Sequence, residues 1–320
     1  MAKAKSTPTP QNAVEPVENG ANGHPSTPRL NVLKTYKLYI GGKFPRTESG
    51  RYEVLKNESG ELIANVCRAS RKDFRNAVVA ARAAQPGWAG RSALNRGQIL
   101  YRAAEMLEGR RQQLLAEMVR LGLNRAVAEQ EVNVAIDRLV YYAGWCDKYQ
   151  QVFSSVNPVA SSHFDFSVQE PTGVVSAFAP EESGLAGLVS VLAPIIAGGN
   201  TCVVLASAPY ATAAVTFAEV LHSSDVPGGV VNILTGRRDE LVGHFSTHMD
   251  VNAMVYAGND AAHIKTIRQN ATQNVKRIAV NDTRDWHAEA AQSPYRILET
   301  QEVKTTWHPI ESGLGGSGKY

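Results

Sequence analysis

The sequence has few cysteines, little net charge and no long apolar run. Its three cysteines, Cys67, Cys146 and Cys202, are scattered over 320 residues without the spacing of a disulfide framework or a zinc site, which favours a reducing compartment. A formal net charge of +3 gives little electrostatic support for nucleic-acid binding. We find neither an apolar window that could span a bilayer nor a secretory signal, so we expect a cytoplasmic protein without a membrane partner.

The composition is otherwise that of a globular protein. Hydrophobic residues make up 43% of the chain and charged residues 20%, and the length permits one large core or two smaller ones. Residues 1–33 are the exception, because they are rich in Pro, Thr, Asn and Gly and contain almost no large apolar side chain. We predict a disordered tail there, and a flexible tail at the Gly-rich residues 311–320.

Short apolar runs alternate with helical patterns between residues 173 and 281. The run 192–205 begins as an apolar helix, passes through a Gly-Gly-Asn helix stop and ends in a β-branched strand. This order predicts an α/β fold, a Rossmann-like parallel sheet with flanking helices. Such sheets bind ligands at the carboxyl ends of their strands. Function is therefore expected in four loops, at residues 179–184, 206–210, 236–238 and 257–262.

Hairpins followed by helices are predicted before this region. Ser70 is expected to cap a helix in which Asp73 completes a capping box, and Pro86 with the following glycine is expected to end that helix. The other predicted elements are strands at 36–40, 52–55 and 61–68 and helices at 92–108, 111–121 and 125–150.

Two alternating segments, residues 162–170 and 295–309, are predicted to be extended strands. An exposed strand with bulky apolar side chains is a liability unless another chain covers it, which favours an interface here. The predicted interface residues are Phe164, Phe166, Val168, Val303, Thr305 and Trp307.

Five motifs occur in a characteristic order. They are Leu-Tyr-Ile-Gly-Gly-Lys-Phe at 38–44, Ala-Ala-Arg-Ala-Ala-Gln-Pro-Gly-Trp at 80–88, Glu-Pro-Thr-Gly-Val-Val at 170–175, the run 192–205, and Val-Pro-Gly-Gly-Val-Val-Asn-Ile-Leu-Thr-Gly at 226–236. Together they resemble the aldehyde dehydrogenase superfamily over about residues 36–280. The resemblance implies the half of that fold that carries a nicotinamide dinucleotide, plus a small β oligomerisation arm. The implied parts are a tail at 1–33, a helical and hairpin part at 34–161, an arm strand at 162–172, a Rossmann-like domain at 173–294, a terminal arm strand at 295–310 and a tail at 311–320.

The residues that carry the family's chemistry are replaced in this chain. The family has Pro-Trp-Asn, whose Asn donates to the oxyanion, where this chain has Pro180-Glu181-Glu182. The carboxylate of Glu182 only accepts hydrogen bonds at neutral pH and would repel an oxyanion. The family's general-base Glu aligns with Asn281, which cannot take a proton at working pH.

The family's nucleophilic Cys lies in a catalytic domain downstream of that Glu. Here no Cys follows Cys202, and only residues 282–294 separate the Rossmann-like half from the terminal strand. The resemblance therefore implies a truncated, non-catalytic member that lacks the catalytic domain. It is similar to the second, degenerate module of family-16-type aldehyde dehydrogenases.

The cofactor site implied by the resemblance is eroded as well. Ala206 replaces the Lys that contacts the cofactor ribose, and Asn259 or Asp260 would cap the N–H groups that should meet phosphate. Arg237 and Arg238 could meet a phosphate, but a solvated loop is the simpler interpretation. We expect no cofactor and keep NAD or NADP as an alternative. The eroded site comprises Pro180, Glu181, Ala206, Gly236, Gly258 and Asn259.

Other chemistries have less support. Glu181 and Glu182 could form an acid/base pair, but adjacent side chains usually point apart. His244 and His248 have a spacing that suits a metal, yet no further ligands complete the set, so no metal site is expected. Cys202 lies in an apolar strand run, which favours an inert core thiol over a nucleophile.

Three functions are consistent with these residues. The preferred one is an aldehyde dehydrogenase-like pseudoenzyme, a structural or regulatory subunit that oligomerises with itself or with a catalytic aldehyde dehydrogenase by strand addition. The alternatives are a residual NAD(P)-binding protein and a component of an aldehyde oxidoreductase, which would need a thiol nucleophile.

Overall fold

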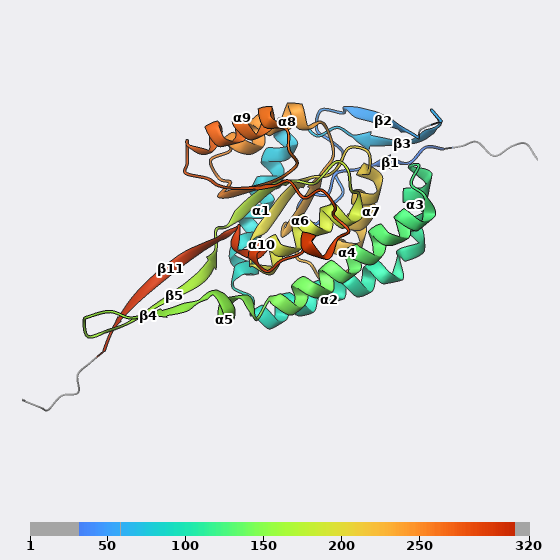
Figure 1. The fold of residues 1–320 in the computed structure, drawn as a ribbon. Helices are drawn as coiled ribbons and strands as arrows, with labels where there is room; N and C mark the ends of the chain where they lie inside the picture. Colours follow the sequence, from blue (N-terminus) through green and yellow to red (C-terminus); the bar gives the residue numbers. More distant parts are fainter. Residues whose placement is uncertain (1–31, 58, 311–320) are drawn as a thin grey trace, which may run out of the picture. The chain divides into compact units, whose positions relative to one another are not determined.

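A five-stranded parallel sheet forms the centre of the computed structural model, which describes residues 32–57 and 59–310 (Figure 1). The strands are β6 (Val174–Phe178), β7 (Thr201–Leu205), β8 (Val231–Leu234), β9 (Ala253–Ala257) and β10 (Arg277–Asn281), in the spatial order β10-β9-β6-β7-β8. Every residue of the first four is buried, as apolar runs in a sheet covered on both faces should be. The predicted α/β fold with a Rossmann-like sheet is confirmed.

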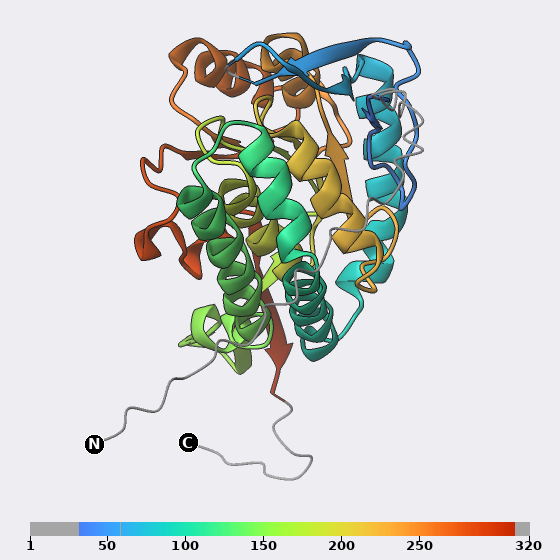
Figure 2. The ribbon, with the colours of Figure 1, turned by 90° about the vertical axis from the view of Figure 1, so that its right-hand side faces the viewer.

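Helices cover both faces of this sheet. The helices on one face are α2 (Ala93–Gly109), α4 (Arg125–Trp145), α6 (Leu185–Ala197) and α7 (Ala211–His222). Those on the other face are α1 (Arg71–Ala89), α8 (Arg238–Thr247) and α9 (Ala261–Ala271). Figure 2 shows α2, α3 (Arg111–Arg120) and α4 side by side in front of the sheet. None of the described helices is both long and apolar enough to cross a membrane.

The capping box of α1 is confirmed, but three helices differ from the prediction. Ser70 accepts from the Asp73 N–H and Asp73 accepts from the Ser70 N–H. α1 continues through Pro86 because this proline is exposed and the buried Trp88 beyond it anchors the last turn. α4 ends at Trp145, and a separate short helix, α5 (Tyr149–Phe153), follows. α8 occupies residues where no helix was predicted.

A second sheet has the order β1-β3-β2, with β1 at Thr35–Tyr36, β2 at Tyr52–Lys56 and β3 at Leu62–Cys67. The strand predicted at 36–40 contributes little to it, because Tyr39 pairs with Ile233 at the edge of the parallel sheet instead. The chain then turns at Gly42, which has φ +76° and where a Cβ would lie 2.9 Å from the Gly228 Cα, so a side chain has no room there.

The third sheet, here called the arm, has the order β11-β5-β4 and extends away from the parallel sheet (Figure 1). Its strands are β4 (Ser155–Asn157), β5 (His163–Pro171) and β11 (Gln301–Pro309). β5 and β11 are antiparallel along their whole length, so the two segments predicted to be extended strands pair with each other. The extended segment predicted from residue 295 begins only at Gln301, because Tyr295–Leu298 form helix α10.

The predicted tails lie almost entirely outside the described residues, which include only Val32 and Leu33 of residues 1–33 and none of 311–320. Among the described residues, those from Leu33 to Ile310 belong to one unit. The predicted boundaries within that unit stay predictions.

Candidate functional site

The carboxyl ends of β6 and β9 define the candidate site. The chain passes from β6 to β7 and β8 on one side and then returns to place β9 and β10 on the other side of β6. The strand order therefore reverses between β6 and β9. In open parallel sheets the crevice at such a switch point is where ligands bind.

Arg238, the first residue of α8, fills this switch point. Its guanidinium donates to the carbonyl oxygen of Ala179, just beyond β6, and to that of Ala257 at the end of β9, 3.1 Å away. Its guanidinium carbon also lies 5.7 Å from the ring centroid of Phe178 and 5.6 Å from that of Tyr256, within range for cation–π attraction. Only 13% of the side chain is exposed. The prediction of a solvated loop at Arg238 is therefore wrong.

Glu181 holds Arg238 in this position. Its Oε1 accepts from the Arg238 Nε at 2.7 Å, and its Oε2 accepts from the Ala208 N–H at 2.9 Å and from the Ser207 hydroxyl at 3.3 Å. One carboxylate thus joins the loops after β6 and β7 to the start of α8. Charge-assisted hydrogen bonds of this kind are stronger than neutral ones, so the network closes the crevice with the chain's own charges.

The turn after β9 is closed in the same manner. Gly258 has φ +149° and donates to the Asn281 carbonyl at 2.9 Å, and a Cβ on Gly258 would lie 3.2 Å from an Arg238 nitrogen. Asp260 accepts from the His263 N–H at 2.8 Å and caps α9, and this bond lowers the pKa of the Asp260 carboxyl. The N-terminus of α9 therefore carries a carboxylate where an anionic ligand would need N–H groups. Asn259 is exposed beside it.

Asn281, which the resemblance aligns with the family's general base, is a buried amide. Asn281 ends β10 and directs its Nδ2 towards Glu299 Oε2 at 3.4 Å. Burial raises the pKa of the Glu299 carboxyl, while Arg296, 3.3 Å from its other oxygen, opposes that shift. The sequence prediction missed Glu299 because it lies 18 residues away, beyond the turn that leads to α10.

Residues 282–294 fold back over the start of α6. The Trp286 indole N–H donates to Glu182 Oε1 at 3.0 Å, and the Arg138 guanidinium donates to the Trp286 and Ala288 carbonyls at 3.3 and 2.6 Å. Trp286 itself is buried. The carboxylate predicted to repel an oxyanion is thus engaged as the acceptor of a tryptophan.

A buried carboxylate from α4 completes this closure. Glu131 Oε2 accepts from the Ala186 N–H at 2.7 Å in the first turn of α6. Its Oε1 accepts from the Ser183 hydroxyl at 2.9 Å and lies 2.9 Å from His287 Nε2. Ser183 and His287 both contact Glu131 rather than each other, so this set lacks the arrangement of a catalytic triad.

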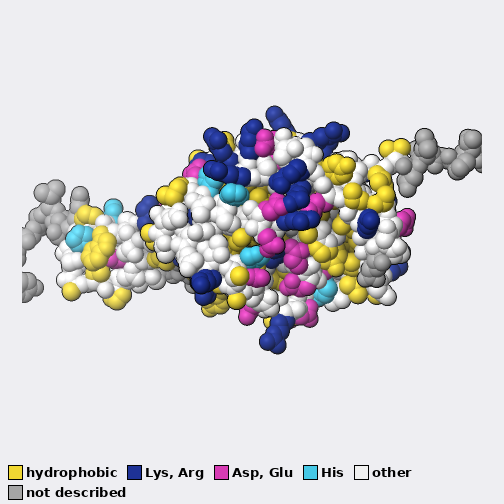
Figure 3. Space-filling view, turned by 90° about the horizontal axis from the view of Figure 1, so that it is seen from above, with side chains coloured by type: hydrophobic (Ala, Val, Ile, Leu, Met, Phe, Trp, Pro, Cys, Tyr) yellow, Lys and Arg dark blue, Asp and Glu magenta, His cyan; other side chains and the backbone are white. Residues whose placement is uncertain are grey.

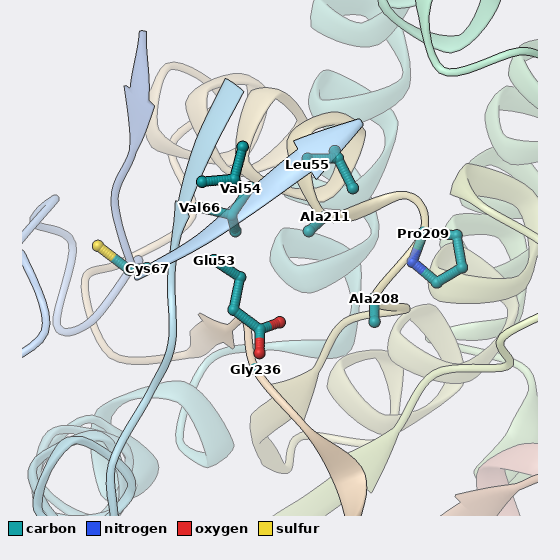
Figure 4. A pocket seen from close by; sticks show the side chains of 9 residues that line it. All are labelled: Glu53, Val54, Leu55, Val66, Cys67, Ala208, Pro209, Ala211 and Gly236. Atoms are coloured by element: carbon teal, nitrogen blue, oxygen red, sulfur yellow. The ribbon is translucent and has the colours of Figure 1, made fainter. Parts of the chain in front are cut away.

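A hollow of ≈ 260 Å³ lies between β2, β3 and the loops after β7 and β8. Figure 4 shows Glu53 extending towards Gly236, with Ala208 and Pro209 opposite and the Cys67 sulfur pointing away. Glu53 is ion-paired with Arg237 at 2.5 Å. Gly236 has φ +152° and lies where a Cβ would come within 3.2 Å of the Ala69 nitrogen. The lining residues are Glu53, Val54, Leu55, Val66, Cys67, Ala208, Pro209, Ala211 and Gly236.

No accessible thiol or metal cluster lies among the described residues. All three cysteines are buried, and burial raises the pKa of the Cys146 thiol to about 12 and that of Cys202 further still. No group of three or more His, Cys, Asp or Glu side chains in the described part of the chain could hold a metal. His244 and His248 both lie at the end of α8, outside the switch point.

The arm places the predicted interface residues on opposite faces. Phe164, Phe166 and Val168 are every second residue of β5 and therefore share one face of the arm. On this face Phe164 is paired with His308 and Val168 with Lys304. The register puts the remaining three on the other face: Val303, Thr305 and Trp307 pair with Gln169, Ser167 and Asp165. Phe164 is 46% exposed, Val303 63% and Trp307 57%. Figure 3 shows hydrophobic side chains gathered on the arm at its left.

The comparisons with known proteins agree with this architecture. The sequence profile of the Aldehyde dehydrogenase family matches residues 44–282. Cytosolic 10-formyltetrahydrofolate dehydrogenase is 30% identical over 258 residues in both Mus musculus and Homo sapiens, covering 79% of this chain and 29% of each relative. The chain thus spans less than a third of these curated relatives.

Solved structures show the same fold. An NAD+ complex of an aldehyde dehydrogenase from Bacillus cereus has a TM-score of 0.73 at 24% identity, covering 77% of this chain and 50% of that one. HpcC from Thermus thermophilus also gives 0.73 at 24% identity, covering 77% of this chain and 48% of that one. The match to one half of such structures agrees with the parallel sheet and its flanking helices. From its profile match and its relatives, the chain belongs to the aldehyde dehydrogenase family.

Proposed function

We propose that this chain is a non-catalytic aldehyde dehydrogenase-fold subunit, which assembles with itself or with a catalytic aldehyde dehydrogenase through its arm. The observation that carries the proposal is the closed switch point, where Arg238 and Glu181 occupy the crevice between β6 and β9. A dinucleotide at this place would have to break those contacts and leave two carbonyl oxygens without their donor, which costs binding free energy.

The chemistry of the surrounding residues supports the absence of turnover. Aldehyde oxidation through a covalent intermediate needs an accessible nucleophile and a base. Cys202 is fully buried in β7, and burial keeps its thiol protonated by raising its pKa. Asn281 offers no proton acceptor with a suitable pKa, and Glu182 presents an acceptor where an oxyanion would need donors.

The arm supports the assembly part of the proposal. β11 is the edge strand of its sheet, so about every second one of its nine residues presents backbone N–H and C=O groups to a further strand. Beside it, the face of β4 and β5 exposes Val156 and Phe164 around an apolar hollow of ≈ 330 Å³. Strand addition with apolar contact uses both features and requires none of the catalytic residues.

Light scattering after size-exclusion chromatography tests assembly directly. We expect the full chain to exceed the mass of a monomer, or to co-elute with a full-length aldehyde dehydrogenase mixed with it. The variant Val156→Ser/Phe164→Ser should lose this association. The matched control Leu94→Ser/Tyr101→Ser removes two equally exposed apolar side chains from α2 and should retain it. The proposal is contradicted if the chain stays monomeric and does not co-elute with the aldehyde dehydrogenase. It is also contradicted if both variants lose association to the same extent.

A residual dinucleotide binder is the second candidate, and the hollow beside Gly236 favours it. This hollow lies at the carboxyl ends of β7 and β8, where parallel sheets accept ligands. Calorimetry with NAD and NADP at millimolar concentration separates the candidates. If the parent chain gives a saturable heat of binding, and Arg238→Ala increases it, the result would support the dinucleotide binder. It would also overturn the proposal of a subunit that binds no cofactor. No heat with either cofactor would remove it.

A further inference from the structure

A second hollow, of ≈ 530 Å³, lies between the first turns of α1 and the end of α8. It is separate from the switch point and from the arm, and neither the proposed assembly nor the family's chemistry uses it. Its lining includes Arg71 and Arg75 from α1 and His244 and His248 from α8. Four nitrogen-bearing side chains thus surround one space, and no carboxylate is among the residues that line it.

The two arginines lie one helical turn apart and are not neutralised by an acidic side chain. Neither Arg71 nor Arg75 forms an ion pair with any residue that the structure describes, whereas the other two cations of α1, Lys72 and Arg82, do. On the same helix, Lys72 pairs with Glu48 at 2.9 Å and Arg82 with Asp250 at 2.8 Å. Positive charge therefore accumulates at this hollow.

The positive charge of the arginines also affects the pKa values of the two histidines. The pKa of His244 is lowered by burial and, secondarily, by the positive charge of Arg71. Burial also lowers the pKa of His248, with smaller contributions from Lys276 and Arg75, against an opposing effect of Asp250. A bound anion would offset this field and supply the charged partner that both arginines lack, while the Nδ1 of His248 already accepts from the Asp250 N–H at 3.2 Å.

The hollow also has an apolar side. Phe74 lies at its base with 1% of its surface exposed, and its ring stacks on Phe245 at 4.0 Å and lies edge-on to His248 at 5.6 Å. Met249 stands at the rim with 64% of its surface exposed. A volume of ≈ 530 Å³ exceeds that of a free phosphate ion and leaves space for a carbon-bearing group against these two side chains.

We propose that this hollow binds a small organic phosphate. Arg71 and Arg75 hold the phosphoryl oxygens, His244 and His248 donate further hydrogen bonds, and the organic part rests mainly on the exposed Met249, with Phe74 beneath it. Arginine suits this task because its planar guanidinium donates two parallel hydrogen bonds to phosphate oxygens.

Calorimetry with phenyl phosphate, inorganic phosphate and phenol tests the proposal on the full chain. We expect phenyl phosphate to bind more tightly than inorganic phosphate, and phenol not to bind. Arg71→Gln/Arg75→Gln should raise the dissociation constant for phenyl phosphate about tenfold or more, because hydrogen bonds from charged donors are lost. Both arginines are exposed, so this variant should fold, which circular dichroism verifies.

A matched control removes two positive charges elsewhere. Lys37→Gln/Arg120→Gln alters two exposed side chains that have no ion-pair partner among the described residues and do not line the hollow. This variant should bind phenyl phosphate like the parent chain. An equal loss in both variants, unchanged binding in Arg71→Gln/Arg75→Gln, or equal affinity for inorganic and phenyl phosphate would overturn the proposal.

Discussion

The carboxyl edge of the parallel sheet and the arm differ in how far their side chains are covered by the chain itself. At the sheet edge, Arg238, Glu181 and Glu131 pair with carbonyls, N–H groups and one another, so the chain satisfies its own polar atoms. On the arm, Phe164 and Trp307 stay half exposed although the strands that carry them are paired along their whole length. The first region satisfies its polar groups internally, while the second leaves apolar side chains exposed. Function is therefore to be sought where the chain leaves surface uncovered.

The largest effect on this comparison should come from Glu131. Glu131→Ala removes the acceptor for the Ala186 N–H, the Ser183 hydroxyl and His287, all of which are then left without this partner. We expect the free energy of unfolding in urea to fall by about 3 kcal/mol. Glu129→Ala, which loses only the exposed i,i+4 pair with Arg125, should change it by less than about 0.5 kcal/mol. Similar losses in the two variants would mean that the sheet edge is not closed by Glu131.

Arg238 should have the next largest effect. Arg238→Ala leaves the Ala179 and Ala257 carbonyls and Glu181 without their donor, and we expect a loss of about 2 kcal/mol in the free energy of unfolding. Arg237→Ala is the matched control, because its guanidinium contacts only the partly exposed Glu53. A stability loss no greater than that of the control would contradict a structural role for Arg238.

A substitution on the arm should change association and leave folding nearly intact. Trp307→Ala removes an indole that is 57% exposed, so the monomer should lose less than about 0.5 kcal/mol. If the ring is buried on assembly, the dissociation constant should rise about tenfold or more, because an aromatic side chain contributes roughly 1.5–3 kcal/mol when fully buried. Sedimentation at graded concentrations measures the constant. An unchanged constant would place the contact on the face of Phe164 alone.

The smallest effect concerns the buried thiol of Cys146. Burial raises its pKa from 9.0 to about 12, so the unfolded chain releases this proton at lower pH than the folded chain. The contribution of Cys146 to stability should therefore fall as the pH rises from about 9 towards 12, and Cys146→Ala should weaken that dependence. At about pH 8 the folded chain should not react with a thiol reagent until it is unfolded. Rapid labelling of the native chain would contradict this burial.

The strands of the parallel sheet were predictable because each is an apolar, β-branched run between turn residues, as Thr201–Leu205 illustrates. α8 was missed although Leu241, Val242 and Phe245 carry a helical spacing, because Gly243 and several polar residues interrupt it. The helix break predicted at Pro86 was wrong because the tertiary hydrogen bond from Trp88 to the Ile196 carbonyl anchors the following turn.

The location of the candidate site was predictable from the sequence, but the side-chain contacts within it were not. The loops after β6, β7, β8 and β9 do converge, as the strand order requires. That Arg238 would turn inwards, and that His287 would meet Glu131 across 156 residues, depends on side-chain paths that no local pattern encodes. The same holds for the arm, where only the register with β11 shows that the six predicted residues divide between two faces.

That division has a consequence for stoichiometry. A flat neighbour laid against one side of the three-stranded ribbon would dehydrate the rings of Phe164 and Phe166 but leave the indole of Trp307 in water. Burying the exposed side chains of both faces requires a contact on each face of the arm. One face-to-face contact between two chains covers only one of these faces, so covering both takes at least two separate contacts.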